Sequence, residues 1–135
     1  IPAIMHKMFL AKQNNENVVL WGNGSPLREF TYSKDLAHIL LFLLEHYNEK
    51  NPINVGNTVE RSIKNVTELI AECMNFNGSI MWDATKPSGQ YRKPSDNTKL
   101  MKLDWPPGMF TSFERAIKTS CKWFVENYPN VRGGK

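Results

Sequence analysis

The chain has 135 residues, of which 41% are hydrophobic and 11% aromatic, so it can bury the core of one modest domain and is not a disordered protein. Its net charge of +4 comes from lysines spread along the sequence, which is weaker than the footprint of a nucleic-acid-binding protein but suits an anionic ligand. The sequence also has no apolar run of the roughly 20 residues that a membrane-spanning helix needs.

Apolar residues at helical spacing predict a first helix that begins at residue 1 and ends at residues 13–15. Residues 18–20 are typical of a short buried strand, and residues 28–32 of a second strand or extended segment. A helix is predicted over residues 34–47 with Ser33 as its N-cap. The apolar stripe expected to face the core on this helix consists of Leu36, Ile39, Leu40, Leu43 and Leu44.

Residues 53–55 predict a short strand that ends at the glycine turn of residue 56. A helix is expected over residues 64–74, followed by a strand over residues 79–83. The residues of this helix expected to point inward are Val66, Leu69, Ile70 and Cys73.

Residues 85–94, rich in proline, glycine and basic residues, predict a loop, and a short helix is expected over residues 97–103. A capping-box pattern at residues 111–114 marks the start of a last helix over residues 112–128. Its expected buried face consists of Phe113, Ala116, Ile117, Ser120, Trp123 and Phe124.

Mixed short strands and amphipathic helices predict a small α/β fold, a mixed α+β unit with too few strands for a doubly wound sheet. We expect one subdomain over residues 1–128 and a flexible tail over residues 129–135. Because the sequence starts at Ile1 without an initiator methionine and enters a helix directly, we expect a fragment of a longer polypeptide.

The segment over residues 21–30, WGNGSPLREF, is the most informative part of the sequence. Its two glycines permit positive φ and close approach of the backbone, and its proline stiffens the exit from the turn. Trp21 offers a flat apolar surface, and Arg28 is a planar, two-pronged donor for phosphate oxygens. These residue types suit a nucleotide diphosphate; a plain β-turn with a core tryptophan and a surface arginine is the structural alternative.

The same ten residues resemble the W-G-(S/T)-G-x-x-x-R-(E/D)-F segment of the extended short-chain dehydrogenases that modify sugar nucleotides. Within that superfamily they are most similar to the GDP-L-fucose synthase family. The resemblance implies an enzyme that epimerises GDP-4-keto-6-deoxymannose and reduces it to GDP-L-fucose with NADPH. It also implies that Trp21 lines the nucleotide-sugar pocket and that Arg28 contacts the pyrophosphate.

Residues 82–93 are the second candidate segment. By composition residues 85–94 are an ordinary basic surface loop, but the longer stretch resembles F-D-x-(S/T)-K-P-D-G-x-x-(R/K)-K of the same family. The resemblance implies that Lys93 approaches the ligand. Trp82 stands for the family's phenylalanine and Ser88 for its aspartate, and neither change removes a cation.

Residues 1–7 resemble the family's (H)-V-I-P-A-L-(I/L)-x-(K/R) stretch, a helix whose inner face borders the substrate. The resemblance implies that Ile4 and Lys7 line the pocket; a solvated Lys7 on an ordinary amphipathic helix is the alternative. In the family a catalytic histidine precedes this stretch, so no catalytic residue is expected within this fragment.

The remaining candidates for chemistry have structural explanations. The two cysteines, Cys73 and Cys121, lack metal-ligand spacing and predict reduced thiols in a cytoplasmic protein. The three histidines have no acidic partner at ligand spacing, so no metal site is expected. Asp35, in the first turn of a predicted helix, is explained by the helix dipole.

The sequence contains neither a strand-turn-helix with G-x-x-G-x-x-G nor a serine with Y-x-x-x-K. The resemblance therefore implies that NADP(H) is bound mainly by an N-terminal Rossmann half, and that this fragment alone is inactive. It further implies a GDP-sugar substrate and a homodimeric enzyme, with neither nucleic acid nor membrane as a partner. Two alternatives stay open: part of another NAD(P)-dependent sugar-nucleotide epimerase or dehydratase, and a non-enzymatic basic binding module.

Overall fold

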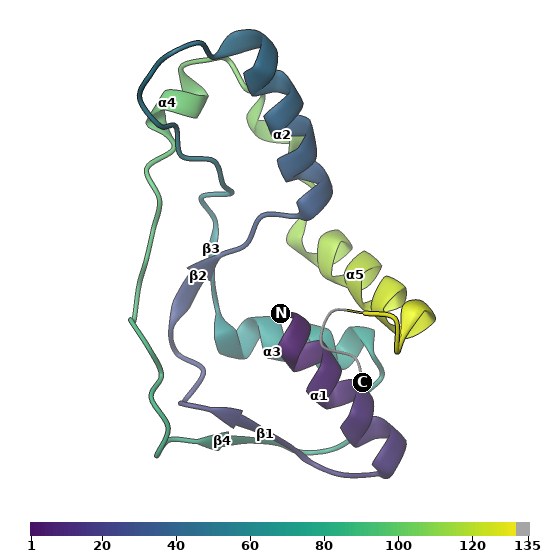
Figure 1. Ribbon diagram of the computed structural model, residues 1–135. Helices are drawn as coiled ribbons and strands as arrows, with labels where there is room; N and C mark the ends of the chain where they lie inside the picture. The colour runs from purple at the N-terminus through teal and green to yellow at the C-terminus, as the bar shows by residue number, and fades with distance from the viewer. Residues whose placement is uncertain (132–135) are drawn as a thin grey trace.

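The computed structural model describes residues 1–131 and shows an elongated molecule of helices and short strands (Figure 1). The elements in chain order are α1 (Pro2–Asn14), β1 (Val18–Trp21), β2 (Leu27–Glu29), α2 (Ser33–His46), β3 (Glu60–Ser62), α3 (Ile63–Cys73), β4 (Ile80–Asp83), α4 (Thr98–Met101), the 3-10 helix η1 (Pro107–Met109) and α5 (Phe113–Asn127). The prediction of a small mixed α/β unit is confirmed.

The strands form two separate pairs rather than one sheet. β1 and β4 are parallel, with Val18 opposite Ile80 and Trp21 opposite Asp83. β2 and β3 are antiparallel, with Arg28 opposite Arg61. The strand predicted over residues 53–55 is wrong: this stretch is irregular and joins neither pair, whereas β3 lies later, in a stretch without apolar alternation.

The larger of two hydrophobic clusters, here called the main lobe, packs α1, α3 and α5 around β1 and β4. The inward face expected for α3 is confirmed, since Val66 and Ile70 are buried and Leu69 and Cys73 are half-buried. On α5 the expected Ala116, Ile117 and Phe124 are buried, Phe113 and Ser120 are half-buried, and Trp123 is exposed. Its place in the core is taken by Cys121, which lies on the side of the helix that faces the cluster.

A second, much smaller cluster, here called the small lobe, lies under α2 at the other end of the molecule (Figure 1). Its fully buried side chains are Ile39, Leu100 and Trp105. The wide buried stripe predicted for α2 is wrong: Leu36, Leu40 and Leu44 are exposed. Within residues 1–131, α2 packs on the side that faces the short α4 and Trp105, and the rest of its apolar surface is exposed.

The helix ends correct two further expectations. α2 begins at Ser33 itself, with Tyr32 as an N-cap that makes no side-chain bond. The first-turn Asp35 is buried, and its carboxylate accepts hydrogen bonds from the Thr111 amide at 2.8 Å and the Thr111 hydroxyl at 2.7 Å. It therefore ties α2 to the segment that leads into α5, a role beyond the helix dipole. At α5 the N-cap is Ser112, which accepts from the Arg115 amide.

Residues 132–135 of the predicted flexible tail lie outside the described part of the chain, and in residues 129–131 the side chain of Val131 packs against the main lobe. None of the helices in residues 1–131 is long and apolar enough to cross a membrane.

Candidate functional site

The turn between β1 and β2 presents the indole of Trp21 to solvent. Alternation along β1 places Val18 and Leu20 in the main lobe and turns Val19 and Trp21 outward. Trp21 is 64% exposed, although tryptophan side chains are on average highly buried. The indole is therefore a free flat apolar surface at the edge of the turn.

The two glycines of this turn are required by its geometry. Gly22 and Gly24 have φ of 79° and 73°, in the left-handed region that other residues rarely adopt. A methyl group on Gly22 would lie 2.6 Å from the Ser88 hydroxyl oxygen, and one on Gly24 would lie 2.7 Å from the Trp82 ring. The loop over residues 85–94 is thus packed directly against the turn. From the sequence alone, the loop and the turn were considered as two separate segments.

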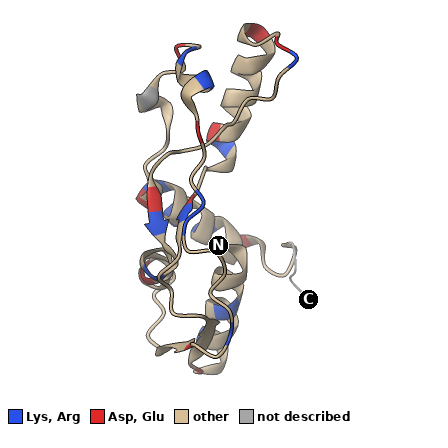
Figure 2. Cartoon of the chain, turned by 90° about the vertical axis from the view of Figure 1, so that its left-hand side faces the viewer, with Lys and Arg blue, Asp and Glu red and all other residues tan. Residues whose placement is uncertain are grey.

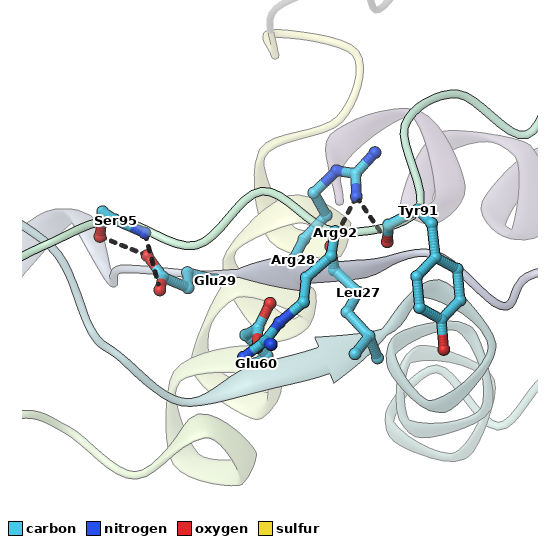
Figure 3. A network of polar contacts seen from close by, with 7 residues as sticks. All are labelled: Leu27, Arg28, Glu29, Glu60, Tyr91, Arg92 and Ser95. Atoms are coloured by element: carbon cyan, nitrogen blue, oxygen red, sulfur yellow. Dashed lines mark hydrogen bonds and ion pairs between the residues drawn. The ribbon is translucent and has the colours of Figure 1, made fainter.

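Arg28 holds this loop through its guanidinium group. It donates to the Tyr91 carbonyl oxygen at 3.4 Å (Figure 3) and to the Gln90 carbonyl oxygen at 2.6 Å. A third bond runs to the carbonyl of Leu27. The Leu27 amide also donates to the Tyr91 carbonyl oxygen, at 2.8 Å. Arg28 as a whole is half-buried, while the bonds of its guanidinium to Gln90 and Tyr91 lie at an exposed position between β2 and the loop.

Two acidic side chains hold the same loop farther along. The Glu60 carboxylate on β3 pairs with Arg92 at 2.6 Å, and the Glu29 carboxylate on β2 accepts from the Ser95 amide at 3.1 Å and from its hydroxyl (Figure 3). The hydrogen bond to Glu60 and its negative charge raise the pKa of Arg92 above its ordinary value. Residues 90–95 therefore run along β2, on the edge opposite to β3.

The structure places the five predicted site residues on three elements: the β1–β2 turn with its flanking strands, the loop over residues 85–94, and α1. Trp21 borders the turn, Arg28 grips the loop, and Lys93 is exposed on that loop next to Arg92. Lys7 on α1 donates to the Val19 carbonyl oxygen at 2.9 Å, which brings α1 against β1. Ile4, half-buried, packs against the main lobe. The turn and the loop thus meet beside β2, whereas Lys7 and Ile4 lie on α1, which contacts β1 and the main lobe.

The sequence did not identify Glu29, Glu60 and Ser95 as parts of this site. Glu60 is bonded to a residue 32 positions away, and Glu29 to one 66 positions away. No local pattern marks such partners. The only sequence signal was that Glu29 is the acid next to Arg28 in the quoted motif.

Several cavities of the described residues lie apart from the predicted site residues, and one of about 410 Å³ has Arg61 and Thr111 in its lining. A cavity of about 460 Å³ lies between α1, α5 and residues 32–33, and its lining is mostly apolar and includes none of the five predicted site residues. In residues 1–131 no three acidic, histidine or cysteine side chains are placed to hold a metal ion. Figure 2 shows basic segments distributed over the length of the molecule rather than gathered on one element.

The chain is similar to a family model and to several known proteins. The sequence model of the NAD dependent epimerase/dehydratase family matches residues 1–56. The chain is 43% identical over 134 residues to the GDP-L-fucose synthase of Dictyostelium discoideum, covering 98% of this chain and 42% of that protein. With the GDP-L-fucose synthase of Escherichia coli it is 34% identical, covering 98% and 44%.

A solved structure of a GDP-L-fucose synthetase from Naegleria fowleri bound to NADP superposes with a TM-score of 0.91 and 40% identity, covering 97% of this chain and 41% of that one. The chain therefore spans about two fifths of the length of the relatives that it matches. Over nearly its whole length the chain is homologous to the GDP-L-fucose synthases, and the family resemblance inferred from its motifs is confirmed.

Proposed function

We propose that residues 1–128 are the C-terminal, substrate-binding part of an enzyme that converts GDP-4-keto-6-deoxymannose to GDP-L-fucose by epimerisation and NADPH-dependent reduction. The observation that carries this proposal is the position of Arg28. Its guanidinium holds residues 90–91 against β2, and the exposed Trp21 stands at the other end of the turn that leads into β2, in a chain 43% identical to a GDP-L-fucose synthase.

The residues around Arg28 suit the parts of a sugar nucleotide. A guanidinium has five N–H donors, and bonds to phosphate oxygens are charge-assisted, so a diphosphate competes well against the neutral carbonyls of Gln90 and Tyr91. Lys93 and Lys7 supply further positive charge at the two sides of the site. Trp21 offers its face to an aromatic base or to the apolar side of a sugar, and Ile4 an aliphatic contact on α1.

The residues present do not fit the pyrophosphate of NADP(H). A dinucleotide is normally cradled where a glycine-rich turn opens into a helix N-terminus. Here the glycine turn after β1 leads into β2, another strand. We therefore propose that NADP(H) and the catalytic groups belong to an N-terminal Rossmann half of a full-length, homodimeric enzyme, and that this chain alone is inactive.

The part played by this chain in the reaction is then to bind and orient. Contacts with the nucleotide, distant from the reacting carbons, hold the sugar in place for chemistry by groups outside this chain. Its unpaired thiols suit the reducing cytoplasm, where we expect the enzyme to act.

The proposal is tested with the full-length protein. We expect it to oxidise NADPH when GDP-4-keto-6-deoxymannose is added, and to yield GDP-L-fucose. Protection against limited proteolysis should follow GDP-sugars rather than UDP- or dTDP-sugars; preference for another base would identify a different sugar-nucleotide epimerase or dehydratase. Salt-sensitive binding of single-stranded nucleic acid without any effect of nucleotide sugars would instead identify a basic binding module.

A further inference from the structure

Helix α2 carries a row of leucines that no residue of the described chain covers. Leu36, Leu40 and Leu44 are 37%, 53% and 82% exposed, and Leu41 beside them is 62% exposed. At 3.6 residues per turn the first three fall in one line along the helix. Polar residues occur on another side of α2, at His38 and Glu45.

The packing beneath α2 is too small to account for so apolar a helix. The small lobe has three buried hydrophobic residues, and its partner helix α4 has one turn. Residues 53–55 lie against this lobe in a strand-like sequence, yet they pair with no strand of the described chain. Exposed leucines next to an unpaired extended segment are typical of an interface from which the partner has been removed.

We propose that the Leu36–Leu40–Leu41–Leu44 face of α2 is the surface on which the NADP-binding remainder of the full-length protein docks. This inference rests on the proposed function, because it takes that remainder to be part of the same polypeptide. The relatives carry about three fifths of their length outside the matched region, and one of them binds NADP. Such a segment is present at high effective concentration beside α2, which favours it over a separate partner.

The charge pattern of α2 supports an apolar partner surface of this kind. The leucine face carries no ionisable side chain, while Lys34, His38 and Glu45 lie along its exposed border. Interfaces between parts of one chain commonly have such an apolar centre with a polar rim. We therefore expect Leu40 and Leu44 to be covered in the full-length protein and Glu45 to stay in solvent.

This expectation is tested by cysteine labelling of the full-length protein. Two variants, Leu44→Cys and Glu45→Cys, place a thiol at adjacent, exposed positions of α2. In native buffer we expect the thiol at position 44 to react with a maleimide at least tenfold more slowly than the thiol at position 45, and in urea both should react alike. Leu40→Cys and His38→Cys provide a second matched pair. Equal native rates within both pairs would overturn the proposal.

A photo-crosslinking experiment identifies the occupant. A benzophenone amino acid replaces Leu41 in a mixture of isotopically light and heavy copies of the full-length protein. Crosslinks within single copies, from α2 to the NADP-binding region, support the proposal; crosslinks between light and heavy copies would show that a second copy covers α2 and overturn it.

The two proposals fail separately. Neither labelling nor crosslinking requires a substrate, so slow labelling and intrachain crosslinks in a protein that does not turn over GDP-4-keto-6-deoxymannose would support the docking surface and refute the proposed function.

Discussion

Arg92 pairs with Glu60 across the strand that carries Arg28: the segment of Arg92 lies along one edge of β2, and Glu60 belongs to β3 on the other edge. The Glu60 side chain is only 12% exposed, whereas that of Arg92 is 59% exposed. A nearly buried carboxylate on β3 thus holds a more exposed cation on the loop. Lys93, the next residue of the loop, is exposed, so its position depends on how Glu60 holds Arg92.

Replacing Glu60 should therefore affect substrate binding without affecting the chemical step. We expect Glu60→Gln in the full-length enzyme to raise KM for the GDP-sugar about 3- to 5-fold, or about 1 kcal/mol, with kcat unchanged. The control is Glu126→Gln, which removes the carboxylate of the exposed Lys122–Glu126 pair on α5. A lowered kcat at unchanged KM would contradict this positioning role.

Arg28 should matter more than any other side chain of the site. Arg28→Ala removes the donors that face the loop, and we expect the dissociation constant for the GDP-sugar to rise at least tenfold, about 1.4 kcal/mol. Arg28→Lys keeps the charge but loses the fork, so its affinity should lie between the two. Arg115→Ala, at an exposed position on α5, is the control and should bind normally. Calorimetry that finds equal affinity for Arg28→Ala and wild type would remove Arg28 from the site.

Gly24 should be the least replaceable residue of the turn. In Gly24→Ala, residue 24 would have to keep a φ of 73°. The new methyl group would lie 2.7 Å from the Trp82 ring and 3.0 Å from the Lys64 side chain. We expect the free energy of unfolding to fall by about 2–4 kcal/mol, from backbone strain and overpacking together. Gly108→Ala, where a methyl group meets nothing within 4 Å, should change it by less than about 0.5 kcal/mol. Urea denaturation measures both, and equal losses would disprove the argument from packing.

Asp35 should contribute to stability through Thr111. Asp35→Ala leaves the Thr111 amide and hydroxyl without their acceptor, at a cost of about 1–3 kcal/mol in the free energy of unfolding. Asp35→Asn keeps one side-chain oxygen as an acceptor and should lose less. If thermal unfolding shows that alanine and asparagine are equally tolerated, the helix dipole alone would account for Asp35.

Cys121 should make stability depend on alkaline pH. Burial raises the pKa of its thiol from 9.0 to about 12, so between these values the unfolded chain loses a proton that the folded chain keeps. The free energy of unfolding must then fall as pH rises from about 9 towards 12. Cys121→Ala lacks this titration, and its stability should decline less over the same range. Parallel pH profiles of the two proteins, measured by urea denaturation, would show that the thiol titrates normally.

Strong helical periodicity was sufficient to predict where the helices lie but not what covers them. The helix predicted over residues 64–74 corresponds to α3, Ile63–Cys73, and its inward side was also correct. For α2 both limits were displaced by one residue and the buried stripe was wrong, because periodicity identifies an apolar face and says nothing of its neighbour. The strand prediction for residues 53–55 was wrong for a related reason, because a strand requires a partner strand and the described chain supplies none there.

The candidate site could be predicted only as far as its local segments. Residues 21–30 marked both Trp21 and Arg28 by residue type alone. The bonds from Glu29 to Ser95 and from Glu60 to Arg92 depend on how the loop returns to β2, which no spacing in the sequence records. The contact of Gly22 with Ser88 likewise depends on how the loop returns and could not be predicted from the sequence.

The position of β2 and β3 between the two lobes has a mechanical consequence (Figure 1). The two hydrophobic clusters of the described chain share no side chain, and β2 and β3 lie between them. A ligand held by Arg28 would therefore hold the strand pair that connects the clusters rather than either cluster.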